Sequence, residues 1–128
     1  MSTAVNKVAN VIIPVADQDR AVGIYTRELG LEKRLELSFG PGVRWIEVAP
    51  VGADSMIALR PPSPGVTAGA KQTGISLQTG KADAYHAELK ACGVDVDAQI
   101  GRFGESVPPT FWLRDHEGNV LQVTEAVA

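Results

Sequence analysis

The sequence predicts an α+β fold made of two tandem βαβββ modules. Each half of the chain carries one helical pattern that follows a strand and precedes three more strands. The two predicted helices stop at Gly30 and Gly93, which lie 63 positions apart. The closing strands of the two halves repeat at an offset of 64, with residues 57–59 matching residues 121–123. Self-similarity at a fixed offset is the signature of a duplicated unit.

The first half begins with a β-branched run at residues 8–15, which predicts a strand. Asp17 is a candidate N-cap for the helix that follows, because a carboxylate accepts hydrogen bonds from the free N–H groups of a first helical turn. Apolar residues recur at helical spacing up to the stop at Gly30. Three further strands complete this half, at residues 31–37, 43–49 and 55–60.

The second half repeats this order. Residues 74–78 predict a strand, and residues 81–92 predict a helix that stops at Gly93. Gly118 and Asn119 end a turn at 115–119 that favours a hairpin, because both residue types tolerate positive φ. The remaining strands are expected at residues 94–100, 110–114 and 120–125.

Two segments lack periodicity. Residues 61–70 are rich in Pro and Gly, so they are expected to link module one (about 6–60) to module two (about 71–126) within a single domain, 1–128. Residues 101–109 are expected at the rim of the fold, either as a plain surface loop or as a lid over a ligand.

Composition excludes several classes of protein. The chain has 128 residues, of which 45% are hydrophobic and 21% charged, and this is typical of a globular domain. The formal net charge is −3 without a basic patch, which argues against nucleic acid as a partner. No apolar run approaches the ~20 residues of a membrane span. The single cysteine, Cys92, excludes an internal disulfide and fits a cytoplasmic location.

Four segments, in order and at matching spacing, resemble the vicinal oxygen chelate superfamily of glyoxalases, bleomycin-resistance proteins and extradiol dioxygenases. They are Val15-Ala-Asp-Gln-Asp-Arg-Ala, Tyr25-x-x-Glu-Leu-Gly-Leu, Ala87-Glu-Leu-Lys-Ala-Cys-Gly-Val and Leu113-Arg-Asp-His-Glu-Gly-Asn-Val-Leu. The resemblance implies a curved, cup-shaped mixed sheet with the helices outside. His116 stands where the family commonly has Pro, a departure within a turn.

The resemblance also identifies four positions for metal ligands. Metal-dependent relatives place one His or Glu on each of four strands, and these positions fall here on Asn10, Ala58, Gly74 and Gln122. Ala and Gly offer no donor atom, and Asn and Gln offer neutral amide oxygens in place of imidazoles and carboxylates. We therefore expect neither a transition metal nor another cofactor.

Strand alternation assigns the side chains that face the cup. An apolar surface with a few polar groups and both tryptophans is typical of a small-molecule pocket. The alternatives are that the tryptophans belong to the core or a dimer interface, and that the charged members are solvated at the rim. The residues expected to bind the ligand are Asn10, Ile12, Trp45, Glu47, Met56, Ala58, Arg60, Ser76, Trp112, Gln122 and Thr124.

These observations favour a metal-free protein that holds a flat, partly apolar small molecule between Trp45 and Trp112, as antibiotic-sequestering relatives do. The alternative is a lyase, isomerase or dioxygenase of the same fold with an atypical or absent metal site. Glu47, the only charged acid expected inside the cup, is then the one weak candidate for acid–base chemistry. A third reading is a structural or regulatory dimer with a collapsed cavity. The resemblance also implies a homodimer in which each cavity draws on modules of opposite chains.

Overall fold

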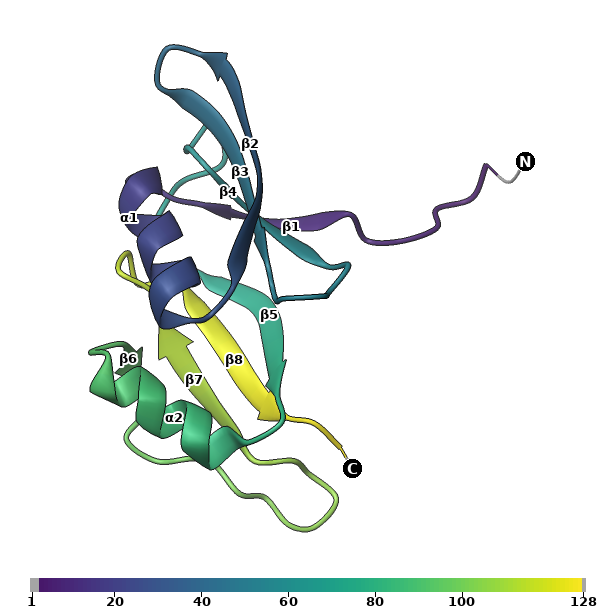
Figure 1. The fold of residues 1–128 in the computed structure, drawn as a ribbon, viewed down its shortest axis with the longest axis vertical. Coiled ribbons are helices and arrows are strands. Elements are labelled where there is room, and N and C mark those ends of the chain that lie inside the picture. Colours follow the sequence, from purple (N-terminus) through teal and green to yellow (C-terminus); the bar gives the residue numbers. More distant parts are fainter. Residues whose placement is uncertain (1–2, 128) are drawn as a thin grey trace.

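The computed structural model describes residues 3–127. Its first half forms a four-stranded sheet with the order β1-β4-β3-β2 (Figure 1). β1 pairs with β4 in parallel, and the other neighbours pair antiparallel. The strands are β1 (Asn10–Pro14), β2 (Glu32–Gly40), β3 (Val43–Ala49) and β4 (Met56–Arg60).

The helix of the first half has two parts, α1 (Gln18–Gly23) and η1 (Ile24–Glu28), the second of which is π-helical. The Asp17 carboxylate accepts a hydrogen bond from the Arg20 backbone N–H at 3.0 Å, as its predicted role as N-cap requires. Gly30 follows the helix with φ +87°, a conformation that glycine adopts without steric cost. The spacing of the apolar residues does not reveal the π-helical turn, because the same spacing fits a regular α-helix.

The second half forms a separate four-stranded sheet with the order β5-β8-β7-β6, in which β5 and β8 are parallel. This order matches that of the first sheet, so the predicted pair of βαβββ modules is confirmed. The elements are β5 (Gln72–Thr79), α2 (Ala82–Ala91), β6 (Asp95–Val96), β7 (Thr110–Arg114) and β8 (Val120–Glu125).

The strand bounds that differ most from prediction are those of β2 and β6. β2 continues to Gly40, beyond the expected end at residue 37. β6 has only two residues, where the sequence predicts a strand over 94–100. The physical reason lies at Asp97, whose carboxylate accepts a hydrogen bond from the Trp112 backbone N–H at 3.1 Å and so takes a donor that a longer strand would use.

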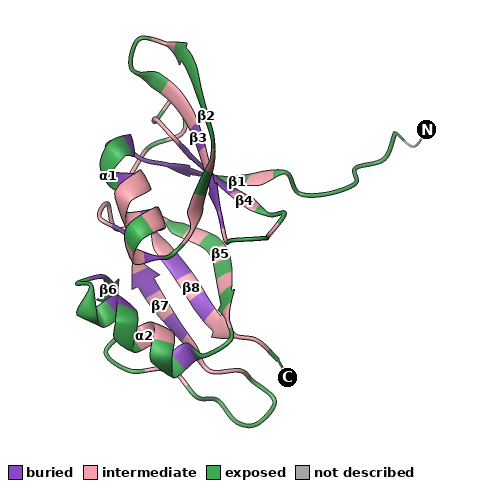
Figure 2. Ribbon diagram, in the orientation of Figure 1, coloured by how far each residue is buried: buried purple, intermediate pink, exposed green. Residues whose placement is uncertain are grey.

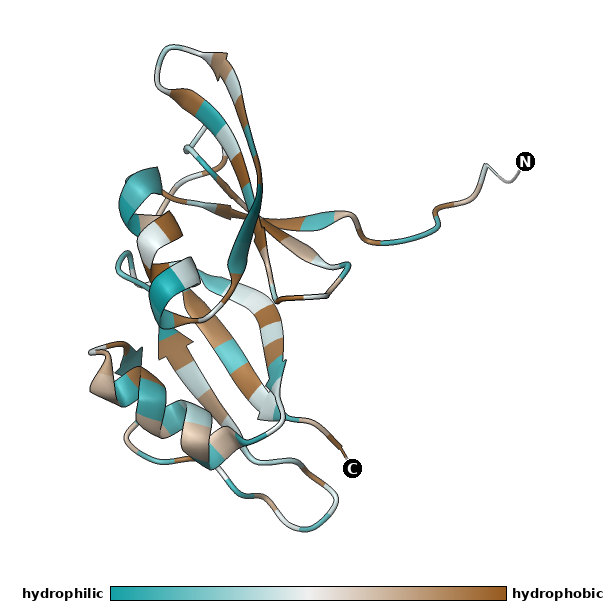
Figure 3. Ribbon diagram, in the orientation of Figure 1, coloured by the Kyte–Doolittle hydropathy of each residue, from teal (hydrophilic) through white to brown (hydrophobic). Residues whose placement is uncertain are grey.

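Both helices lie on the same side of the two sheets, and the N-terminal arm extends away from the body on the other side (Figure 1). The buried residues gather where the helices meet the sheets (Figure 2). Along β7 and β8 apolar side chains alternate with polar ones, which gives each strand one core face and one open face (Figure 3). Among residues 3–127, no helix has the length and apolarity needed to cross a membrane.

Polar contacts join the two halves on the helix side. Asp115 is 7% exposed and accepts hydrogen bonds from the Tyr25 hydroxyl at 2.8 Å and from the amide side chain and backbone N–H of Asn119, each at 3.0 Å. Burial, followed by the charge of Asp115, raises the pKa of Tyr25 well above its usual value. The Glu117 carboxylate accepts hydrogen bonds from the backbone N–H groups of Ala16 and Asp17 at 2.8 and 2.9 Å. The halves are therefore fixed to each other by charge-assisted hydrogen bonds, of which the one between Tyr25 and Asp115 is buried.

Candidate functional site

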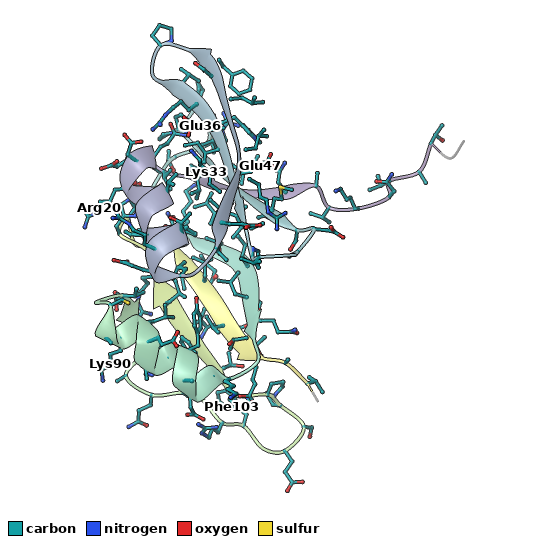
Figure 4. The ribbon with its side chains drawn as sticks, viewed as in Figure 1. Arg20, Lys33, Glu36, Glu47, Lys90 and Phe103 are labelled. Atoms are coloured by element: carbon teal, nitrogen blue, oxygen red, sulfur yellow. The ribbon has the colours of Figure 1, made fainter. Side chains whose placement is uncertain are left out.

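Three predicted ligand contacts cluster on the open face of the first sheet. The pairing of Ile46 with Leu59 sets Trp45 across from Arg60 on neighbouring strands. The Trp45 indole N–H donates to Glu47 Oε2 at 2.6 Å, and the Arg60 guanidinium carbon lies 5.8 Å from the centre of the indole ring. Figure 4 shows Glu47 on the side of the sheet away from α1 and Arg20. The hydrogen bond and the cation–π contact hold the indole in one orientation before any ligand arrives.

Apolar side chains extend this face along β1 and β2. Ile12, Leu35 and Leu37 remain 43%, 37% and 46% exposed. Leu35 pairs with Glu47 and Leu37 with Trp45, so both leucines belong to the same face, although neither is predicted as a contact. A register shift between Lys33 and Leu35 interrupts the alternation, and a β-bulge of this kind cannot be located from the sequence pattern. In the sequence, the only sign that Leu35 and Leu37 share a face is that they flank the polar residue Glu36.

The open face of the second sheet is polar by contrast. Ser76 and Trp112 both pair with Gln122, and the Ser76 hydroxyl donates to the Gln122 side-chain oxygen at 3.0 Å. The hydroxyls of Thr110 and Thr124 lie 3.4 Å apart on the same face. This half of the predicted site supplies hydrogen-bonding groups around one indole.

The four family positions for metal ligands do not fit a metal. Ala58 is fully buried beside Glu47 and carries no donor atom, and the Gln122 oxygen already accepts from Ser76. Gly74 has φ +72°, a backbone conformation that a side chain such as histidine rarely adopts. Within residues 3–127, no three His, Cys, Asp or Glu side chains gather in a way that suits a metal ion. The donor chemistry and the backbone at Gly74 both disfavour a catalytic metal here.

A cavity of 620 Å³ lies between the edge of the first sheet and β5. It draws on two predicted contacts, Met56 and Ser76, and on Gly74. Asn10 pairs with Met56 at the adjoining edge. Neither tryptophan lines this cavity, and in a single chain Trp45 and Trp112 stand on separate sheets. That the two indoles face one ligand therefore stays a prediction.

Comparison with models of protein families establishes the family of the chain. The model of the Glyoxalase/Bleomycin resistance protein/Dioxygenase superfamily matches residues 7–123. The chain belongs to this superfamily. The predicted resemblance is thereby confirmed over nearly the whole chain.

Individual proteins are similar to the chain in sequence, and two of them are also similar in fold. TnmS3, an antibiotic binding protein from Streptomyces sp. CB03234, is 29% identical with a TM-score of 0.84, covering 98% of this chain and 100% of its own. A superfamily member from Sphaerobacter thermophilus DSM 20745 is 30% identical with a TM-score of 0.86, covering 95% and 98%. The uncharacterized protein YetH of Bacillus subtilis (strain 168) is 26% identical over 94% of this chain and 99% of its own.

Proposed function

We propose that this protein binds a flat, partly apolar small molecule without transforming it and without a metal, as a sequestering member of its superfamily. The proposal rests on the residues at the four positions where metal-dependent relatives have their ligands. None of these residues supplies an imidazole or a carboxylate. The similarity to TnmS3, an antibiotic binding protein, supports a binding role and places antibiotics among the ligands to test.

The ligand is proposed to lie between Trp45 and Trp112. Trp45 is oriented by Glu47 and Arg60, and its neighbours Leu35 and Leu37 offer apolar surface. Trp112 lies among amide and hydroxyl groups, which suit the polar edge of an aromatic molecule. Indoles supply large contact area at low entropic cost, so one on each side of a planar ligand gives both affinity and orientation.

A second chain is proposed to bring the two indoles together. β1 and β5 stand at the ends of their sheets with free backbone groups, and the first sheet leaves Ile12, Leu35 and Leu37 open to solvent. A homodimer that places the first module of one chain opposite the second module of its partner covers these apolar residues and forms a cavity from both. Light scattering is expected to give about 27 kDa, twice the chain mass of 13.5 kDa. A mass near 13.5 kDa at micromolar concentration would contradict the dimer.

Binding is tested by quenching of tryptophan fluorescence. Titrations use 8-anilino-1-naphthalenesulfonate as a flat apolar probe, together with a panel of aromatic antibiotics including bleomycin. We expect saturable quenching by at least one compound, and recovery of that compound unchanged after prolonged incubation. Saturation by none of them would favour the structural dimer.

Elemental analysis separates the binding protein from the alternative enzyme. Protein equilibrated with Zn, Mn, Ni and Fe salts and then desalted is expected to carry far less than one metal ion per chain. Stoichiometric metal would favour a glyoxalase-like lyase, isomerase or dioxygenase. A ligand recovered in altered form from metal-free protein would point to the acid–base route through Glu47.

A further inference from the structure

Exposed apolar side chains continue from the open face of the first sheet to one end of the molecule. Leu35, Leu37 and Phe39 alternate along β2, and their exposed fractions rise from 37% and 46% to 64% toward the turn. Val43, the first residue of β3, is 46% exposed beside this turn. Among the described residues, no exposed large hydrophobic residue lies on α1, η1 or α2. We call residues 39–43 the hairpin tip.

A groove of 340 Å³ lies at the other end of the molecule, beside the loop 101–109. Its wall includes one arginine and two glutamates, and it takes apolar surface from Val107, Pro108, Pro109 and Val127. The β2–β3 hairpin and this loop stand at opposite ends of the longest axis (Figure 1). The hairpin tip therefore cannot reach the groove of its own chain.

Three contacts fix the loop to the second module. At its base, Gly101 and Thr110 exchange two backbone hydrogen bonds, at 2.7 and 3.1 Å. Arg102 Nη2 lies 2.6 Å from the carboxylate of Asp83, in the first turn of α2. The Phe103 ring lies over Gly101, where an added Cβ would come within 2.8 Å of two ring carbons. The groove therefore exists before a partner arrives, which lowers the entropic cost of docking.

The positions of the two tryptophans relate the hairpin tip to the loop. Trp45 follows Val43, the start of β3, by two positions, and Trp112 follows Thr110, the start of β7, by two positions. Side chains two positions apart share one face of a strand. β3 starts at one end of the longest axis and β7 at the other, so a twofold axis perpendicular to it brings the two starts together (Figure 1). A dimer in which Trp45 of one chain faces Trp112 of the other therefore places each hairpin tip at the loop of its partner.

We propose that the hairpin tip of each chain docks in the groove beside loop 101–109 of a second copy, with Phe39 as the inserted side chain. The contact rests on the proposed function, because it needs the dimer in which both indoles face one ligand. It removes from water the apolar surface of Phe39 and Val107, which are 64% and 44% exposed in a single chain. Two such contacts per dimer close each ligand cavity at the end where its indoles lie.

The test is cross-linking between single cysteines, in a Cys92→Ser background that removes the exposed native thiol. Chains with Phe39→Cys are co-expressed with chains with Val107→Cys and treated with a bismaleimide, whose flexible spacer tolerates geometry that a disulfide does not. We expect a product of twice the chain mass from the co-expressed pair and none from either variant alone, because the contact joins unlike positions.

The outcomes separate this contact from the dimer itself. A product from Phe39→Cys alone would mean that one tip meets the other, and would overturn the proposal. A dimer by light scattering that gives no cross-linked product from the co-expressed pair would overturn the contact and leave the dimer standing. A monomer by light scattering would remove the dimer and the contact together.

Substitutions at Phe39 measure the strength of the contact. Phe39→Ser is expected to raise the dissociation constant of the dimer by on the order of tenfold or more, the scale of burying an aromatic side chain at an interface. Phe39→Leu keeps an apolar side chain and should raise it less. Because Phe39 is 64% exposed in a single chain, the far-UV circular dichroism of both variants should match that of the unsubstituted protein. Sedimentation equilibrium gives the dissociation constants, and an unchanged value for Phe39→Ser would overturn the proposal.

Discussion

The two modules share one topology, but the open face of one sheet is apolar and that of the other is polar. The first has an apolar open face, with Leu35 and Leu37 beside Trp45. The second surrounds Trp112 with hydroxyl and amide groups. Their third and fourth strands pair alike, so that Glu47 opposite Ala58 corresponds in place to Trp112 opposite Gln122. The two modules thus share a backbone topology, while the side chains on their open faces differ in polarity.

The turns before the closing strands differ in a similar way. In the second module, Asp115 organises the turn by accepting from two backbone N–H groups, Asn119 Nδ2 and the Tyr25 hydroxyl. In the first module, the corresponding segment leaves Val51 77% exposed, and the Asp54 side chain is exposed to solvent. One turn therefore carries the contact between modules, whereas the other is held within its own module by Arg34, which donates to the carbonyl oxygens of Pro50 and Ala53 at 2.9 Å each.

The largest expected effect comes from the organised turn. Asp115→Ala removes the acceptor of four hydrogen bonds and leaves buried donors unpaired, so we expect it to lower the free energy of unfolding by about 3 kcal/mol or more. Asp54→Ala, the matched change in the first module, is expected to cost less than about 0.5 kcal/mol. Urea denaturation followed by circular dichroism measures both, and equal losses would remove the distinction between the turns.

A smaller effect is expected for ligand binding. Trp45→Ala and Trp112→Ala should each weaken binding of the best compound from the fluorescence screen by about 1–3 kcal/mol, the range for loss of aromatic burial and stacking. Calorimetric titration is the measurement, because each variant loses part of the fluorescence signal. If only one tryptophan matters, the ligand lies on a single module and the two halves do not share it.

The smallest effect concerns Tyr85, whose hydroxyl donates to the Leu29 carbonyl oxygen at 2.6 Å. Burial, followed by the charge of Glu88, raises the pKa of Tyr85 to about 12 from 10.0. The unfolded chain therefore loses this proton first, and the stabilisation is complete below pH 10 and lost as pH rises toward 12.

Tyr85→Phe is accordingly expected to cost about 1 kcal/mol at neutral pH and to flatten the fall in stability above pH 10. Urea denaturation at a series of pH values measures both. The fall that persists in this variant belongs partly to Tyr25, whose pKa is raised in the same direction. If the free energy of unfolding of Tyr85→Phe kept the same pH dependence, Tyr85 would not be a cause of the fall in stability above pH 10.

Much of the fold follows from local patterns. The strands Val43–Ala49, Thr110–Arg114 and Val120–Glu125 have the predicted bounds, because strict alternation and flanking turns define them. The short β6 was not predictable, since the carboxylate of Asp97 ends the pairing through a contact fifteen positions away.

Less of the candidate site can be predicted from the sequence. Alternation correctly groups Trp45, Glu47 and Arg60, because they lie on regular neighbouring strands. It misses Leu37, which follows a bulge, and it gives no sign that the His116 ring is buried. Bulges and contacts between modules depend on tertiary packing, which a single sequence does not encode locally.

The backbone at Gly74 limits which side chains this position can carry. Here histidine at position 74 would meet a left-handed backbone (φ +72°), so the strand itself must first refold locally before a new imidazole brings any benefit. Most single substitutions at position 74 therefore carry a conformational cost, whatever side chain they bring.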